Sequence, residues 1–187
     1  MAGDHPPLTG LILAGGQGSR MGGRDKGLVP YRGRLLVDHV IGRVASQVDE
    51  LLISANRNID DYARRGHKVL ADTLPGFQGP LAGVLAGLQA ASNEWVLTVP
   101  CDMPHLPEDL VRRLLEARQE LAIVIAEDGA RTHPAVMLIH TSLAQRLAAY
   151  LASGKRSVHG FQEAVGFATA RFDPAGMVNI NSPPESA

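Results

Sequence analysis

Short apolar runs recur along the chain and alternate with segments in which apolar residues repeat every three or four positions. Within the runs, polar and apolar residues do not alternate, which indicates strands that are buried on both faces of a sheet. We expect strands at residues 10–13, 51–54, 67–70, 95–99, 121–126 and 135–139.

The segments between these runs have the spacing of helices. Three of them, at residues 36–48, 110–115 and 143–151, place apolar residues on one helical face, and Thr141 is the expected cap of the third. A fourth, at residues 79–88, is apolar nearly all round, which predicts a buried helix. Alternating strands and helices predict a doubly wound α/β fold, in which an open, mostly parallel sheet carries helices on both faces.

Length and composition fit one domain without a membrane segment. The chain has 187 residues, and no apolar run approaches the ~20 residues that a membrane helix needs. The net charge of −1 argues against general nucleic-acid binding. The single cysteine, Cys101, is expected to be a core residue rather than a nucleophile, and the first residues carry no apolar signal segment. These features favour a cytoplasmic protein.

A glycine-rich, basic segment follows the first predicted strand. Glycines at positions 15, 16, 18, 22 and 23 are interleaved with the cations Arg20, Arg24 and Lys26. Glycines let backbone N–H groups approach an anion, and the cations add positive charge, so the expected ligand is a compact polyanion. The spacing is neither that of a P-loop nor that of a dinucleotide fingerprint. The alternative is a flexible turn without a ligand.

Two aspartates follow strands that are expected to end at the same sheet edge as this loop. Asp72 follows the third strand and Asp102 follows the fourth. Ligands of doubly wound sheets bind beyond the carboxyl ends of the strands, so the loop and both carboxylates are expected to meet there. Asp102 is the candidate ligand of Mg²⁺, which phosphate-transferring sites hold with one or two carboxylates and substrate phosphates. The alternative is that each aspartate only closes a turn.

The buried helix opens with the segment Gly79-Pro80-Leu81-Ala82-Gly83. The N-terminus of this helix is a second candidate for ligand contact. Gly87, farther along the helix, is better explained by tight packing against the sheet. The seven histidines have no metal-ligand spacing, so they point to no metal centre.

Taken in order, these motifs resemble those of the molybdenum cofactor guanylyltransferases. The resemblance covers essentially the whole chain, and the segments that carry it are Leu13-Ala14-Gly15-Gly16, Arg20-Met21-Gly22-Gly23, Asp25-Lys26-Gly27, Ser54-Ala55-Asn56-Arg57, Asp72, Gly79-Pro80-Leu81-Ala82-Gly83, Pro100-Cys101-Asp102-Met103-Pro104, Arg131-Thr132-His133-Pro134 and Asn179-Ile180-Asn181-Ser182-Pro183. It implies a Rossmann-like nucleotidyltransferase that moves GMP from GTP to the terminal phosphate of molybdopterin. The implied products are molybdopterin guanine dinucleotide and pyrophosphate, and the implied cofactor is Mg²⁺.

The resemblance also implies which residues form the nucleotide site. GTP is expected to contact Leu13, Ala14, Gly15, Gly16, Lys26, Ser54, Asn56, Asp72, Gly79, Pro80, Leu81 and Asp102, with Asp102 also binding Mg²⁺. Some relatives have Asn where this chain has Ser54, and Asn56 is the candidate to make that contact instead. Catalysis is expected to depend on Arg20, Lys26 and Asp102, because bringing two phosphate groups together requires their charges to be neutralised.

The acceptor is expected to bind the second half of the chain. We predict a nucleotide-binding half at residues 8–105 and an acceptor-binding half at residues 106–182 of a single domain, with Arg156, Asn179 and Asn181 contacting molybdopterin. The two asparagines flank one residue in an extended stretch and therefore point to the same side. The alternative for them is a turn near the C-terminus.

The expected partners are GTP, molybdopterin and, transiently, proteins of cofactor biosynthesis or delivery; neither nucleic acid nor a membrane is expected. Two other functions stay open at this point. One is a nucleotidyltransferase of the same fold that uses CTP, or a sugar or isoprenoid phosphate as acceptor. The other is a GTP-binding module without turnover.

Overall fold

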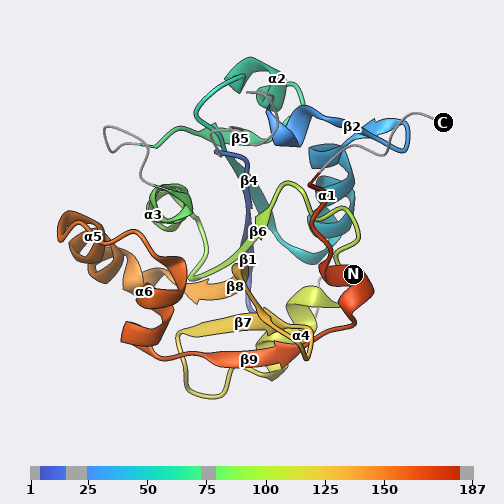
Figure 1. Ribbon diagram of the computed structural model, residues 1–187. Helices are drawn as coiled ribbons and strands as arrows, with labels where there is room; N and C mark the ends of the chain where they lie inside the picture. The colour runs from blue at the N-terminus through green and yellow to red at the C-terminus, as the bar shows by residue number, and fades with distance from the viewer. Residues whose placement is uncertain (1–4, 16–24, 73–78, 182–187) are drawn as a thin grey trace.

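The computed structural model describes residues 5–15, 25–72 and 79–181, and a seven-stranded sheet forms its centre (Figure 1). The strand order is β5-β4-β1-β6-β8-β7-β9. The strands are β1 (Leu8–Leu13), β4 (Glu50–Ser54), β5 (Lys68–Leu70), β6 (Trp95–Pro100), β7 (Ile123–Glu127), β8 (Thr132–His140) and β9 (Ala168–Arg171). β8 is antiparallel to its neighbours β6 and β7, and the other pairs in this sheet are parallel. The predicted mostly parallel sheet is confirmed.

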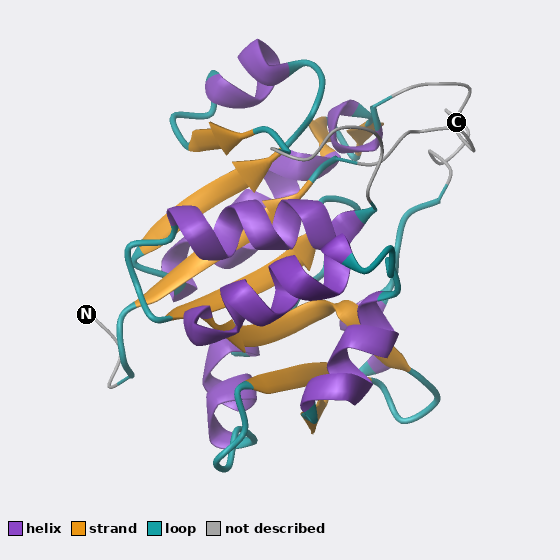
Figure 2. Ribbon diagram, turned by 90° about the vertical axis from the view of Figure 1, so that its left-hand side faces the viewer, coloured by secondary structure: helices purple, strands orange, loops and turns teal. Residues whose placement is uncertain are grey.

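Helices cover both faces of the sheet, as predicted. The α-helices are α1 (Leu36–Val44), α2 (Ile59–Ala63), α3 (Pro80–Ala90), α4 (Leu110–Glu116), α5 (Ala144–Ala152) and α6 (Val158–Val165). α1 and α4 pack on one face, whereas α3, α5 and α6 cover the other, which faces the viewer in Figure 2. The shorter elements are η2 (Lys26–Leu28), η3 (Ala45–Gln47), η4 (Thr141–Leu143), η5 (Pro174–Met177) and the hairpin of β2 (Pro30–Tyr31) and β3 (Arg34–Leu35).

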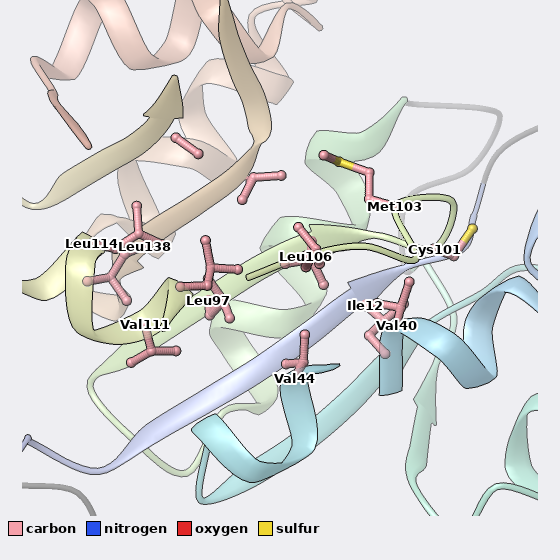
Figure 3. Packing of buried hydrophobic residues seen from close by; sticks show 14 of the residues in the cluster. Ile12, Val40, Val44, Leu97, Cys101, Met103, Leu106, Val111, Leu114 and Leu138 are labelled. Carbon is pink, nitrogen blue, oxygen red and sulfur yellow. The ribbon is translucent and has the colours of Figure 1, made fainter. Parts of the chain in front are cut away.

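The core consists of two apolar layers, one on each face of the sheet. Ile12 of β1 lies beside Val40 and Val44 of α1 in the first layer (Figure 3). The neighbouring residue Leu11 belongs to the second layer, with α3. A Cβ on Gly87 would lie 2.3 Å from a methyl carbon of Leu11, so α3 approaches β1 closely only because this residue is glycine. This contact supports the packing explanation of Gly87.

A bulge interrupts β8 beside the end of β6. Ile125 pairs with Met137 but Ala126 pairs with His133, so residues 134–136 have no counterpart on β7. The Thr98 hydroxyl donates to the Ala135 carbonyl at 2.9 Å, and the amide of the fully buried Gln162 donates to the Pro134 carbonyl at 2.8 Å. Side chains from β6 and α6 therefore fix the shape of this bulge, a feature that is common near active sites.

The structure differs from the sequence-based expectations in its smaller elements and in one helix cap. It contains α2, α6, β9 and the β2–β3 hairpin, which the apolar pattern did not predict. The prediction that Thr141 caps the third helix is wrong. The imidazole of His140 instead accepts the Ser142 N–H at 3.2 Å, which starts the turn η4, and α5 begins only at Ala144. Among the described residues, no helix is long and apolar enough to cross a membrane.

Candidate active site

A cavity of about 300 Å³ opens at the carboxyl ends of β1, β4 and β6. It lies beyond the carboxyl ends of the strands, where the ligand of a doubly wound sheet was expected. The lining residues are Leu13, Ala14, Gly15, Lys26, Ser54, Asp72, Gly79, Pro80, Gly83, Pro100, Cys101, Asp102 and Ala135. The structure therefore brings nine of the residues predicted to contact GTP to one cavity.

Asp102 is the most constrained polar group of this cavity. It is only 6% exposed, and it follows directly after β6, whose side chains are buried on both faces. The Lys26 ammonium group donates to Oδ2 of Asp102, and the amide of Asn179 donates to Oδ1 at 2.9 Å. Both carboxylate oxygens thus accept hydrogen bonds, which offsets the cost of burying the charge.

The segment around Asn179 contacts both Lys26 and Asp102. Oδ1 of Asn181 accepts a second hydrogen bond from Lys26 at 2.8 Å, and the Ile180 N–H donates to the Asp102 carbonyl at 2.9 Å. Lys26, Asp102 and the two asparagines form one hydrogen-bonded chain across the cavity. This chain joins residues predicted for the nucleotide with residues predicted for the acceptor.

Asp72 and Asn56 face each other on the opposite side of the cavity. The Asn56 amide donates to Oδ2 of Asp72 at 2.7 Å, and the Asp72 N–H donates to Oδ1 of Asn56 at 2.8 Å. The other carboxylate oxygen of Asp72 is buried and has no hydrogen-bond partner among the described residues. Asp72 is thus hydrogen-bonded through one carboxylate oxygen only, and Asn56 orients it from outside the lining.

α3 begins at the cavity with a conformation that requires glycine. Gly79 has a φ of +73°, which residues with a Cβ rarely adopt, and Pro80 follows in the first turn. One turn later, a Cβ on Gly83 would lie 2.4 Å from the Ser54 hydroxyl oxygen. The helix start and the end of β4 are thus in direct contact. Leu81, which was predicted to contact GTP, is fully buried in the core and does not line the cavity.

The structure gives little support for other chemistry at this cavity. Cys101 is buried, and burial raises the pKa of its thiol far above the usual range, so it is not a nucleophile. The described residues contain no cluster of three or more His, Cys, Asp or Glu side chains that could hold a metal ion.

A second cavity, of about 190 Å³, adjoins the first. The two share Pro100 and Ala135, and the second is lined by Pro100, Met103, Arg131, Thr132, His133, Pro134, Ala135, Val136 and Asn179. The start of β8, from Thr132 to Val136, forms most of its wall. The hydrogen bond from Asn179 to Asp102 lies between the two cavities, and the amide oxygen of Asn179 has no partner in the part of the chain that the structure describes.

The remaining predicted residues lie elsewhere. Gly16 and Arg20 lie outside the described residues. The guanidinium of Arg156 donates to the carbonyls of Leu151 and Lys155 at the end of α5, at 2.7 and 2.6 Å, and it lines neither cavity. A role of Arg156 in acceptor binding stays a prediction.

Sequence reasoning assigned no function to a buried polar cluster next to Lys26. Asp25 is 8% exposed and accepts hydrogen bonds from the Tyr62 hydroxyl at 2.5 Å and from the Asn58 amide at 3.0 Å. The signals in the sequence were that Asp25 is the one acidic residue in a basic segment and that it belongs to the motif Asp25-Lys26-Gly27.

The fold, a mostly parallel sheet with a cavity at the carboxyl ends of its strands, is shared with solved structures that include a cytidylyltransferase. A molybdopterin-guanine dinucleotide biosynthesis protein A from Archaeoglobus fulgidus has a TM-score of 0.77 at 20% identity, over 94% of this chain and 93% of that one. The 2-C-methyl-D-erythritol 4-phosphate cytidylyltransferase of Thermus thermophilus has a TM-score of 0.71 at 18% identity, over 92% of each chain.

More specifically, the chain belongs to the family described as the MobA-like NTP transferase domain, whose model matches residues 10–165. It is 45% identical to a molybdenum cofactor guanylyltransferase of Yersinia pseudotuberculosis over 181 residues, which are 96% of this chain and 93% of the relative. A protein of the same name from Yersinia pestis is 44% identical over the same share. The resemblance noted from the sequence motifs is confirmed.

Proposed function

We propose that this protein transfers GMP from GTP to the terminal phosphate of molybdopterin and releases pyrophosphate. The observation that carries the proposal is the hydrogen-bonded chain of Lys26, Asp102, Asn179 and Asn181, which joins the two adjoining cavities. A transferase needs two substrates side by side, with positive charge between them. The names of the relatives that cover almost the whole chain support this choice of substrates.

In this proposal the larger cavity holds GTP. Lys26 lies at its rim with its side chain 27% exposed, so its ammonium group can exchange Asp102 for a phosphate oxygen. Repulsion between two phosphate groups amounts to several kcal/mol even at an effective dielectric constant of about 20. Lys26 offsets part of this repulsion without being consumed.

Asp102 is the residue that would hold Mg²⁺. Its carboxylate is a hard oxygen donor at the cavity wall, and Mg²⁺ at phosphoryl-transfer sites commonly has one or two carboxylates and substrate phosphates as ligands. When bound, the ion supplies positive charge between phosphate oxygens and helps to orient them. The donor set of this chain therefore fits a metal that arrives with the nucleotide.

The smaller cavity is proposed to hold the acceptor. Its wall places Asn179 at the boundary with the GTP cavity, where the unpartnered amide oxygen can accept a hydrogen bond from a polar heterocycle. The acceptor phosphate has a second pKa near ~6, so it is mostly a dianion at neutral pH and needs no strong general base. Catalysis then consists of placing this dianion in line with the α-phosphorus of GTP.

The proposal includes a cytoplasmic reaction, consistent with a free thiol at Cys101. Release of the product to a molybdoenzyme or a delivery protein stays a prediction.

The direct test is incubation of the protein with molybdopterin, Mg²⁺ and one of GTP, CTP or ATP. The dinucleotide product is identified by mass spectrometry, and pyrophosphate is measured in parallel. We expect the guanine dinucleotide and stoichiometric pyrophosphate, with GTP preferred over CTP and ATP. Equal use of CTP would contradict the assigned substrate, and GTP binding without pyrophosphate release would indicate a binding module.

Replacing Asn179 and Asn181 with Ala tests the acceptor assignment. We expect a rise in the KM for molybdopterin that exceeds any rise in the KM for GTP. A fall in melting temperature with equal loss of both substrates would show that the asparagines only hold the C-terminal segment. A selective loss of GTP binding would contradict the division of the chain into nucleotide and acceptor halves.

A further inference from the structure

The loop that carries Lys26 is held from behind by a buried carboxylate. Asp25 caps the turn η2, in which Lys26 is the first residue, and Oδ1 of Asp25 accepts the Gly27 N–H at 3.3 Å. The Tyr62 hydroxyl donates to the same oxygen at 2.5 Å. The Asn58 amide donates to the other oxygen at 3.0 Å. Hydrogen bonds to an ionised carboxylate are stronger than those between neutral groups, so this cluster fixes the backbone at Lys26.

Tyr62 also touches this loop sterically. Its side chain is fully buried, and a Cβ on Gly27 would lie 2.4 Å from the phenol oxygen. Burial raises the pKa of the phenol far above its usual range, so the hydroxyl stays a hydrogen-bond donor at any physiological pH. The backbone directly after Lys26 therefore rests on the Tyr62 hydroxyl.

Asn58 contacts Asp25 instead of stabilising the start of its own helix. It occupies the N-cap of α2, where an Asn side chain ordinarily accepts a backbone N–H of the first turn, but it makes no such bond. It also adopts the left-handed conformation, with a φ of +51°. Its amide is directed to Asp25 instead. Such departures from local conformational preference are typical of functional sites.

We propose that Tyr62 and Asn58 are positioning residues that act through Asp25 to hold Lys26 where it can reach both Asp102 and the triphosphate. The proposal rests on the function proposed above, in which Lys26 contacts GTP. None of the three residues of this clamp, Asp25, Asn58 and Tyr62, lines the cavity. Removing a clamp residue should therefore affect nucleotide binding only through Lys26.

The test compares Tyr62→Phe with Tyr31→Phe. Tyr31 is a matched control because its hydroxyl is also hydrogen-bonded, at 2.9 Å to Nε2 of His105, and its side chain is also buried. The readout is the dissociation constant of GTP with Mg²⁺, measured by titration calorimetry without acceptor, together with the melting temperature. We expect Tyr62→Phe to weaken GTP binding about tenfold. Tyr31→Phe should lower the melting temperature as much as Tyr62→Phe does, but it should leave GTP binding unchanged.

A double-variant cycle separates positioning from general stability. In a Lys26→Ala background, Tyr62→Phe should cause no further loss of GTP affinity, because the group that it positions is gone. Asn58 is exposed, and Asn58→Gly removes its amide while glycine tolerates the left-handed conformation. This variant therefore tests the clamp even if Tyr62→Phe folds poorly. We expect it to weaken GTP binding about as much as Tyr62→Phe.

Losses that add in the double variant, or GTP binding by Tyr62→Phe and Asn58→Gly equal to that of the wild type, would overturn the proposal. The GTP-binding readout is independent of the acceptor. A wild-type protein that binds GTP but makes no guanine dinucleotide would therefore refute the proposed function. The GTP dissociation constants of the variants would still test the clamp.

Discussion

The change Asp102→Asn separates the chemical role of this residue from its structural role. An amide has one acceptor oxygen, whereas the Asp102 carboxylate accepts from Lys26 on one side and from Asn179 on the other. If the new oxygen faces Lys26, the new NH₂ group faces the NH₂ group of Asn179. Rotation of the Asn179 amide by half a turn resolves this conflict, because its own oxygen has no partner to lose among the described residues.

The expected loss of stability is consequently small. All hydrogen bonds are retained after this rotation, and what is lost is the ionic part of the contact with Lys26, whose side chain is 27% exposed to solvent. This pair is partly buried, with the Asp102 side chain 9% exposed, and hydrogen bonds that involve charge exceed neutral ones by about 1 kcal/mol. A loss of about 1 kcal/mol corresponds to a fall in melting temperature of roughly 2–4 °C for a domain of this size.

The transfer rate should fall far more. An amide neither neutralises Mg²⁺ nor holds it between phosphates, so we expect a decrease of about 100-fold or more, comparable with the loss of a transition-state donor. The assays are thermal unfolding and the initial rate of pyrophosphate release at several Mg²⁺ concentrations. Asp38→Asn is the matched control, because Asp38 accepts from Arg65 at 2.9 Å in a partly buried ion pair outside the cavity.

We expect Asp38→Asn to lower the melting temperature by a few degrees and to leave the transfer rate unchanged. Unchanged activity of Asp102→Asn at limiting Mg²⁺ would refute the metal role. A fall in melting temperature beyond about 10 °C would refute the rotation of Asn179, because it would correspond to an uncompensated buried group costing several kcal/mol.

Three further predictions concern other parts of the molecule. Lys26→Ala should raise the KM for GTP, and saturating Mg²⁺ should not restore it, because the missing charge is a different one; full recovery would make the lysine peripheral. Thr132→Trp should fill the smaller cavity and raise the KM for molybdopterin at least tenfold, whereas Thr169→Trp on β9 serves as an exposed control; equal kinetics of the two variants would exclude acceptor binding there. A hydrogen bond with His133, aided by backbone N–H groups, lowers the pKa of Asp128 from 3.8 to about 2. The ionised carboxylate of Asp128 therefore stabilises the fold above pH 3.8, and this stabilisation is lost as the pH falls to about 2. The melting temperatures of wild type and Asp128→Asn should converge over that interval.

The apolar pattern predicted the strands that are buried on both faces and missed the elements that are not. β1, β4 and β6 were predicted within two residues, because each is a continuous apolar run. β9 has a single buried side chain, Ala170, and its pattern is therefore too weak to recognise. The reversed direction of β8 was also missed, since strand direction depends on the connection and not on the run itself.

The site was predictable to the extent that strand ends determine it. Asp72 and Asp102 meet at one cavity because the carboxyl ends of parallel strands share a sheet edge. The contact between Lys26 and Asn181 and the clamp of Asp25 by Tyr62 depend on side chains that are far apart in sequence, and local patterns contain no signal for either contact.

The bond between Lys26 and Asn181 joins positions separated by 155 residues, so the order of synthesis determines when the site is complete. β1, β4, β5 and β6 can pair once the first hundred residues have emerged from the ribosome, because each has a partner within this group and only β6 also pairs with a later strand, β8. Asn179 and Asn181 are translated only afterwards, and domains fold progressively as they emerge. A nascent chain that ends before residue 179 therefore still lacks the two asparagines that contact Lys26 and Asp102, and ribosome-stalled chains of this length should bind GTP without transferring it.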